Sequence, residues 1–143
     1  MEMDQFINIA LSLLGWSAVG VFALFAARKV YDVMTPFEVE HELVTDRNVA
    51  VGISKGMFLV AIGILVHGLL ASEKVSKDIY VELLMTLVLL VISFIIMALG
   101  RWLLVKTTPV DFDKEIHEKN NTALSLIEGA WYIALATIIS AAL

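Results

Sequence analysis

Residues 49–71 read VAVGISKGMFLVAIGILVHGLLA, an apolar run that is broken by one charged side chain, Lys55. An apolar run of about 18 or more residues predicts a transmembrane helix. Three further runs of this kind cover residues 7–27, 79–100 and 122–143. We therefore predict an all-α fold. It is a polytopic four-helix transmembrane bundle that forms a single integral membrane domain over residues 1–143.

The overall composition supports this class and excludes others. The chain of 143 residues is 59% hydrophobic and has a mean hydropathy of +0.86, whereas globular proteins average about 45–50% apolar residues. The net charge of −5 disfavours a nucleic-acid partner, which binds a basic face. The chain has no cysteine, and we find no metal-ligand motif and no catalytic constellation. We expect membrane lipid as a partner, no cofactor or metal, and no enzymatic activity.

The lengths and charges of the connections predict the orientation in the membrane. The connections at residues 28–48 and 101–121 are long, whereas residues 72–78 form a tight hairpin. Lys and Arg accumulate in the cytoplasmic loops of membrane proteins. Here they accumulate in the long connections, as Arg28, Lys29, Arg47, Arg101, Lys106, Lys114 and Lys119, with only Lys74 and Lys77 in the hairpin. We therefore expect both long connections in the cytoplasm and both termini on the outer side.

Each long connection contains the same short motif. Thr35-Pro36-Phe37-Glu38 in the first corresponds to Thr108-Pro109-Val110-Asp111 in the second. A hydroxyl at the N-cap, proline at the first position and an acid at the third predict the start of a short amphipathic helix. We call residues 35–48 and 108–121 the first and second elbows. Each short helix is predicted to carry three acids, Glu38, Glu40 and Glu42 in the first elbow and Asp111, Asp113 and Glu115 in the second.

Two interpretations of the elbows remain open at this point. An elbow that rests at the membrane surface is the simpler one. The other is a docking site or a cation-attracting mouth. Surface-bound amphipathic helices usually carry basic polar faces, so the acids do not favour lipid binding by the elbows.

The second half of the chain matches the first without a gap after a shift of 73 residues. The shift places Thr35, Pro36, Asn48, Ala50 and Gly56 on Thr108, Pro109, Asn121, Ala123 and Gly129, and Lys55 on Glu128. This predicts an internal repeat, residues 6–70 and 79–143, in which each unit is a span, an elbow and a span. Two spans per unit give a parallel repeat, unlike the inverted repeats of many transporters.

The ordered elbow motifs also carry a family resemblance. The Thr-Pro-Phe-Glu segment, followed by Glu42, Asn48, Ala50 and Gly56, resembles the domain-of-unknown-function 350 family of YjfL-like small bacterial inner-membrane proteins. The second half, with Glu115, Asn121, Ala123, Glu128 and Gly129, is similar to it as well. The resemblance covers almost the whole chain. It implies a four-helix protein of the bacterial inner membrane with an internal repeat, and it implies no catalytic residue.

Small and polar residues form one stripe on the second span and one on the fourth, because side chains three and four apart share a helix face. The first stripe is Asn48, Gly52, Lys55, Gly56, Leu59, Gly63 and His67. The second is Asn121, Ser125, Glu128, Gly129, Tyr132, Ala136 and Ser140. Small residues permit close packing of transmembrane helices, so we expect these stripes to face each other. Arg28 and Arg101 end the first and third spans. We interpret them as topology anchors at the cytoplasmic side, and the alternative is that either one reaches a carboxylate.

Lys55 and Glu128 are the charged residues within these stripes. Each lies seven residues past an asparagine at the span entrance, which corresponds to a depth of about 10 Å. Charged residues within spans are costly and are functional candidates. Three interpretations remain open. The two side chains pair as a structural lock, within or between chains; Glu128 is a proton or cation site with Lys55 or Arg101 as its counter-charge; or Lys55 reaches the surface while Glu128 is protonated.

Two functions follow from these patterns. The first is a small homo-oligomeric membrane protein that provides a pathway for protons, ions or a small solute along Lys55 and Glu128. The alternative is a non-conducting scaffold whose acidic elbows recruit a cytoplasmic protein partner.

Overall fold

The computed structural model describes residues 3–72 and 78–143, and every regular element in these ranges is a helix. The helices are α1 (Met3–Met34), α2 (Val39–Val44), α3 (Val49–Ala71), α4 (Ile79–Thr107), α5 (Phe112–His117) and α6 (Thr122–Ala142). Within these ranges α1, α3, α4 and α6 are long and apolar enough to span a membrane. The predicted all-α, four-span fold is therefore confirmed. The predicted hairpin, including Lys74 and Lys77, lies largely outside the described residues.

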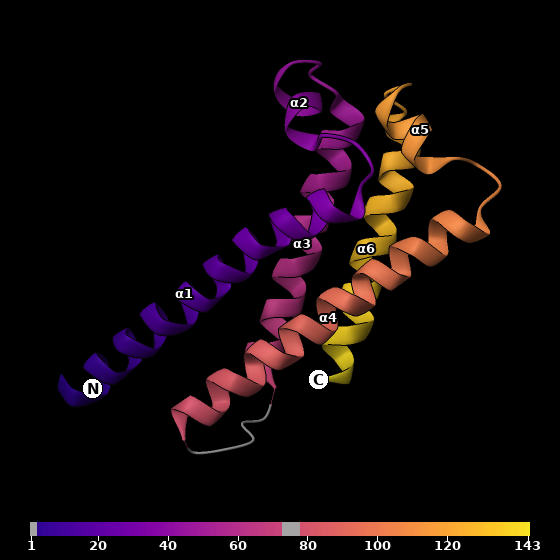
Figure 1. The fold of residues 1–143 in the computed structure, drawn as a ribbon. Coiled ribbons are helices and arrows are strands. Elements are labelled where there is room, and N and C mark those ends of the chain that lie inside the picture. Colours follow the sequence, from indigo (N-terminus) through magenta and orange to yellow (C-terminus); the bar gives the residue numbers. More distant parts are fainter. Residues whose placement is uncertain (1–2, 73–77) are drawn as a thin grey trace.

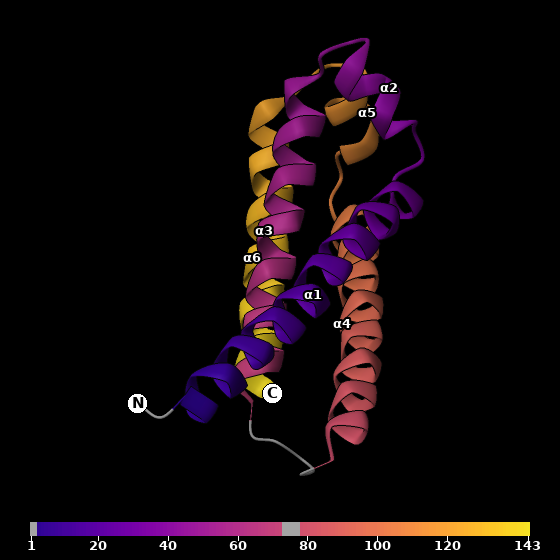
Figure 2. The same cartoon turned by 90° about the vertical axis from the view of Figure 1, so that its left-hand side faces the viewer.

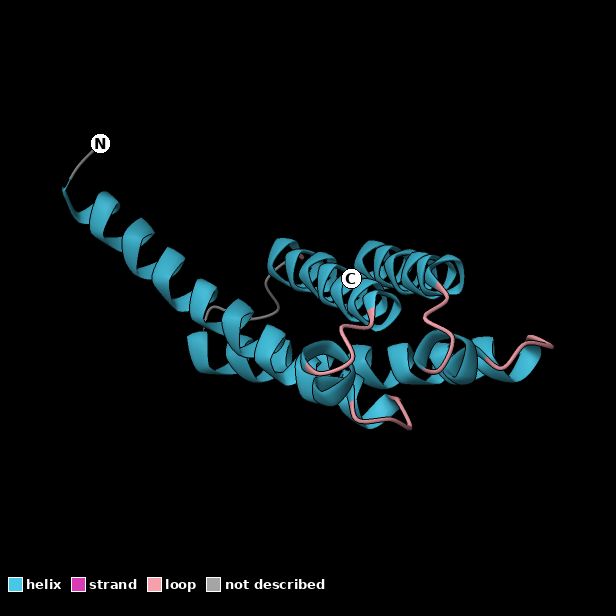
Figure 3. Ribbon diagram, turned by 90° about the horizontal axis from the view of Figure 1, so that it is seen from above, coloured by secondary structure: helices cyan, strands magenta, loops and turns pink. Residues whose placement is uncertain are grey.

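The helices form an inner pair and an outer pair. α3 and α6 lie side by side along their lengths and make the most extensive helix contact, as predicted for spans two and four (Figures 1 and 2). α1 and α4 cross this pair obliquely, and seen from above they lie on one side of it (Figure 3). The short helices α2 and α5 lie together at one end of the bundle, while α1 starts and α6 ends at the other (Figure 1).

The Thr-Pro pairs end the long helices and do not start the short ones. The Oγ1 atoms of Thr35 and Thr108 donate to the carbonyl oxygens of Tyr31 and Leu104, at 3.1 Å and 2.7 Å. A residue before proline is disfavoured in the helical region, which explains why α1 and α4 stop here. The predicted N-caps at the threonines are therefore wrong. The N-caps of α2 and α5 are Glu38 and Asp111.

Because α1 and α4 end later than predicted, Arg28 and Arg101 lie within these long helices. The predicted spans ended at residues 27 and 100, whereas α1 continues to Met34 and α4 to Thr107. Both arginines therefore project from the last two turns or so of a helix and not from a loop. This position allows a long side chain to reach across to neighbouring helices.

The core between α3 and α6 is narrow and partly aromatic. The ring of Phe58 on α3 lies between two tyrosines, 5.5 Å from the ring of Tyr31 on α1 and 5.0 Å from that of Tyr132 on α6. All three rings are fully buried. By contrast, α1 buries only Ala23, Ala27 and Tyr31, so most of its apolar surface is left to lipid or to another chain.

The stripe predicted on α6 faces the core, but the stripe predicted on α3 is rotated by about one residue. On α6 the buried residues are Ser125, Glu128, Gly129, Tyr132 and Ala136, as predicted. On α3 they include Ala50, Ser54, Phe58, Ala61 and Leu65. One residue turns a helix by about 100°, so Lys55 lies at the edge of the contact, while Gly56, Gly63 and His67 are exposed.

The close helix contacts use mostly other glycines than those predicted. A Cβ atom added at Gly68 would lie 2.9 Å from the Cα atom of Ser140 on α6, and one at Gly129 would lie 2.3 Å from the Sδ atom of Met57. A Cβ atom at Gly56 or Gly63 would meet nothing within 4 Å. A Cβ atom added at Gly52 would be in ordinary van der Waals contact with Leu43. Of the four predicted packing glycines, only Gly129 is therefore at a tight contact.

Candidate functional site: a buried ion-pair network

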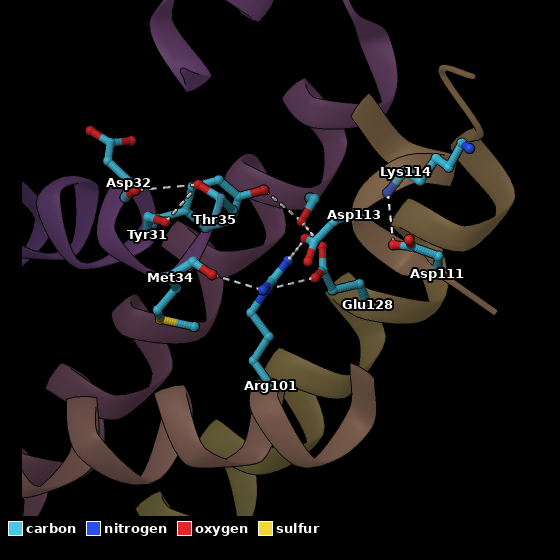
Figure 4. Close-up of polar contacts among 10 residues, drawn as sticks. Tyr31, Asp32, Met34, Thr35, Arg101, Asp111, Asp113, Lys114 and Glu128 are labelled. Carbon is cyan, nitrogen blue, oxygen red and sulfur yellow. Dashed lines mark hydrogen bonds and ion pairs between the residues drawn. The ribbon is translucent and has the colours of Figure 1, made fainter. Parts of the chain in front are cut away.

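Arg101 is the central residue of the site. Its side chain, 7% exposed, extends from α4 into the bundle (Figure 4). Its Nε atom donates to Oε1 of Glu128 on α6 at 2.9 Å, and its Nη1 atom donates to the carbonyl oxygen of Met34 on α1 at 2.8 Å. Its Nη2 atom donates to Oδ1 of Asp113 on α5. One guanidinium group therefore joins four helices. It can do so because its planar fork presents several N–H donors in fixed directions.

Both carboxylate oxygens of Glu128 are engaged inside the chain. While Oε1 accepts from Arg101, Oε2 accepts from the hydroxyl of Ser54 on α3. The Ser54 Oγ atom in turn accepts from the hydroxyl of Tyr31 on α1 at 2.9 Å. Glu128 is only 1% exposed. We call Tyr31, Ser54, Glu128, Arg101 and Asp113 the buried polar network.

Lys55 is outside this network and has a different partner. Its Nζ atom lies 2.9 Å from Oδ1 of Asp32 on α1 and 5.8 Å from the ring centroid of Tyr31. Of the interpretations that the sequence left open, the pairing of Lys55 with Glu128 within one chain is therefore wrong. The cause is the rotation of α3, which turns Ser54, and not Lys55, toward Glu128. The counter-charge of Glu128 is Arg101, which the sequence offered as an alternative.

The two elbows are joined to each other through Asn48, which is buried. Its Oδ1 atom accepts from the N–H of Val51 and caps α3 at 3.1 Å. Its Nδ2 atom donates to Oε2 of Glu42 at 2.9 Å and lies 3.1 Å and 2.8 Å from the carbonyl oxygens of Ile116 and His117 in the second elbow. The first elbow is thus tied directly to the end of α5.

Further contacts between the elbows come from side chains on both sides. The Oδ1 atom of Asn120 accepts from the N–H of Ala50 at 2.8 Å. The imidazole of His117 stacks on the ring of Phe37, with centroids 4.9 Å apart, and its Nδ1 atom lies 2.8 Å from Oε1 of Glu42. The paired elbows therefore form one connected unit.

Residues that are 73 positions apart make equivalent contacts within each elbow. Asn48 and Asn121 each donate their backbone N–H to the carbonyl oxygen of Glu42 or Glu115, and their amide groups to the corresponding carboxylate. The residues just before them, Arg47 and Asn120, have positive φ angles of 51° and 50°. These shared contacts support the internal repeat, which stays a prediction from the sequence.

The elbow acids divide into engaged and exposed groups. Glu42 is buried against Asn48, Asp113 pairs with Arg101, and Glu115 accepts hydrogen bonds from Lys119 and Asn121. These two donors lower the pKa of the Glu115 carboxyl below its usual value. The contact is therefore present above the ordinary carboxyl pKa and is lost as the pH falls through the lowered one. Of the six predicted acids, Glu38, Glu40 and Asp111 are exposed, and Asp111 also accepts from the N–H of Lys114 as the N-cap of α5.

Three residues of the site were not predicted from the sequence: Tyr31, Asp32 and Ser54. The first two lie beyond the predicted end of the first span. For Ser54 a signal exists, because Ala50, Ser54, Phe58, Ala61 and Leu65 follow helical spacing as a second stripe of small and aromatic residues. No group of three or more His, Asp or Glu side chains in the described ranges is arranged to hold a metal ion.

Comparison with known families identifies the chain. A family model described as Domain of Unknown Function (DUF350) matches residues 3–143. The chain belongs to this family. The resemblance inferred from the elbow motifs is therefore confirmed, and the DUF350 match covers both elbows and all of the long helices. No curated protein and no solved structure matches the chain. The DUF350 family is described as one of unknown function, so membership in it assigns no activity to the chain.

The contacts of Asn48 and its counterpart Asn121 lead to a matched stability prediction. Each alanine substitution removes a helix cap, which costs about 0.5–2 kcal/mol. Only Asn48→Ala also removes the hydrogen bonds between the elbows, each worth about 0.5–1.5 kcal/mol. We expect Asn48→Ala to lower the free energy of unfolding by about 1–3 kcal/mol more than Asn121→Ala, measured by circular dichroism in detergent. Equal losses would show that the hydrogen bonds of Asn48 to the second elbow contribute nothing to stability.

Proposed function

We propose that this protein is a non-conducting scaffold of the bacterial inner membrane, whose paired elbows form a fixed docking surface for a cytoplasmic protein. The observation that supports it best is the set of contacts of Arg101, which ties α5 to three of the four long helices. A buried charged network of this kind is weak evidence for stability but can fix a specific arrangement. Here the arrangement that it fixes is the position of the second elbow on the bundle.

The extent of the buried polar network favours a scaffold over a pathway within one chain. The network occupies the elbow half of the bundle. Toward the opposite end, α3 and α6 bury Ala61, Ile62, Leu65 and Ala136. The buried hydroxyls of Ser93 and Thr86 on α4 donate to carbonyl oxygens of their own helix. In the described ranges, a polar route across the membrane is therefore not supported, and the solute pathway is our second candidate.

The exposed acids indicate the chemistry of the partner. Glu38, Glu40 and Asp111 lie on the elbows and are exposed, and they favour a basic peptide segment through complementary charge. The distribution of Lys and Arg supports a cytoplasmic position for this surface. We also propose a homo-oligomer, because α1 leaves most of its apolar surface uncovered, and we assign no catalytic step to any residue.

Two measurements test this proposal. Purified protein in liposomes should give no proton, sodium or potassium flux above that of empty liposomes. A photo-crosslinker at position 38 should capture a protein in intact cells, whereas one at Ile138, which is exposed on α6, should capture lipid only. Charge reversal at Glu40 and Asp111, to lysine, should reduce the capture at position 38.

Other results would overturn the scaffold. Flux through the wild-type protein that Glu128→Gln abolishes would establish the pathway in its place. Equal protein capture at positions 38 and 138, or capture that is unchanged by the charge reversal, would remove the docking surface. A reporter fused after Leu143 that behaves as cytoplasmic would place the elbows on the wrong side for a cytoplasmic partner.

A further inference from the structure

A basic pocket lies between α1, α2 and α3, on the opposite half of the chain from the Arg101 contacts. Its volume is about 300 Å³, and its charged lining consists of Arg28, Lys29, Asp32, Glu40 and Lys55. Three cations against two carboxylates leave one net positive charge. Of the three cations, only Lys55 has a carboxylate partner in the part of the chain that the structure describes, namely Asp32.

The 73-residue correspondence explains why this pocket has a lysine where the second half has a carboxylate. Arg28, Glu40 and Lys55 occupy the positions of Arg101, Asp113 and Glu128. In the second half Arg101 pairs with both carboxylates inside the protein. In the first half a lysine replaces the glutamate and pairs with Asp32, and in the described residues Arg28 is exposed and forms no ion pair. The pocket is therefore complementary to an anion from outside the chain.

An apolar groove continues directly from the basic pocket. It has a volume of about 260 Å³ and is lined by Val21, Leu24, Phe25, Arg28 and Leu59 on α1 and α3. Phe25 and Arg28 line both the pocket and the groove. The groove runs from the elbow end toward the apolar middle of the two helices. A ligand that fills both would have an anionic head and an apolar tail.

We propose that the pocket and groove bind one anionic phospholipid. Its phosphate contacts Arg28 and Lys29, and one acyl chain lies along Val21, Leu24 and Leu59. Basic pockets between transmembrane helices at the cytoplasmic side suit anionic headgroups. Lys55, about 10 Å past the start of α3, also lines the pocket but is paired with Asp32, so Arg28 and Lys29 are the cations left for the phosphate. The site shares Glu40 with the docking surface on the elbows, but the cations that contact the phosphate, Arg28 and Lys29, lie on α1 outside that surface.

The test compares lipids and matched charge variants of the purified, delipidated protein in detergent. Native mass spectrometry measures the binding of phosphatidylglycerol and of phosphatidylcholine with the same acyl chains. We expect preferential binding of phosphatidylglycerol. The double substitution Arg28→Gln with Lys29→Gln should weaken that binding about 25-fold, or about fivefold for each charge. It should weaken phosphatidylcholine binding less, because the choline cation already offsets the phosphate charge of that lipid.

The control removes two equally exposed cations elsewhere. Lys106→Gln with Lys114→Gln should leave the binding of phosphatidylglycerol within about twofold of the wild type, because neither residue lines the pocket. A loss as large as that of the first double variant would show diffuse surface attraction and overturn the site. Equal binding of the two lipids by the wild type would overturn it as well.

Two further arms separate a lipid from a free anion. Inorganic phosphate at the concentration of the lipid should not displace phosphatidylglycerol, since it cannot occupy the apolar groove. Val21→Trp, which fills that groove, should weaken lipid binding. Displacement by phosphate, or full lipid binding by Val21→Trp, would assign the pocket to a free anion and overturn the phospholipid.

Discussion

Replacing Arg101 by methionine is expected to lower the free energy of unfolding by about 3–5 kcal/mol, because it leaves the buried carboxylate of Glu128 without a counter-charge. Asp113 is half-buried and can be solvated, but Glu128 is 1% exposed. The substitution also leaves the carbonyl oxygen of Met34 without its donor. Unfolding in mixed detergent and denaturant, followed by circular dichroism, measures the loss.

The design of this experiment includes a matched control and a second-site rescue. Arg28→Met removes the residue 73 positions earlier, which is exposed, and should cost less than about 1 kcal/mol. Adding Glu128→Leu to Arg101→Met should recover much of the loss, since replacing both partners of a buried pair by apolar groups is often nearly neutral. Strictly additive losses in this double-mutant cycle would show that the two side chains are not energetically coupled.

Gly68→Ala is expected to destabilise the bundle by about 1–3 kcal/mol through overpacking. The added Cβ atom would lie 2.2 Å from Oγ and 2.9 Å from Cα of Ser140. A serine hydroxyl can rotate away, but the backbone of α6 must shift, and α3 and α6 form the main helix contact. The thermal midpoint of the purified protein in detergent should fall accordingly.

Gly63→Ala is the control for this substitution, on the same helix and with the same side chain. A Cβ atom at Gly63 meets nothing within 4 Å. Alanine is about 1 kcal/mol more favourable than glycine in a helix, so Gly63→Ala should leave the midpoint unchanged or raise it. If both variants behave alike, the close approach of α3 and α6 at Gly68 does not contribute to stability.

The sequence was informative wherever one local rule decided the structure. Asn48 and Asn121 stand just before long apolar runs and cap α3 and α6. These helices begin at Val49 and Thr122, as predicted. Length and hydropathy alone were sufficient for the four spans. The contact between spans two and four could also be predicted, because the small residues of the fourth span do face α3.

The site was harder to predict because it depends on rotation about a helix axis. Two adjacent stripes on α3 are both rich in small residues, one through Lys55 and Gly56 and the other through Ser54 and Ala61. Choosing between them requires the crossing angle of the partner helix, which residue spacing does not determine. The sequence left two roles open for Arg101, a topology anchor and a counter-charge of Glu128. Spacing alone could not choose between them, whereas as a residue of α4 Arg101 reaches Glu128.

The unequal lengths of the four long helices have a mechanical consequence. At a rise of about 1.5 Å per residue, α1 with 32 residues is about 48 Å long and α4 with 29 residues is about 43 Å. The inner helices, with 23 and 21 residues, are about 35 Å and 32 Å long. Only the inner pair therefore matches a hydrocarbon layer of about 30 Å without a large tilt, whereas the outer helices must lean, as Figure 1 shows. A thinner bilayer should increase that lean. Because Arg101 near the end of α4 is bonded to Asp113 on α5, hydrophobic mismatch would be transmitted to the elbows as a change in their position.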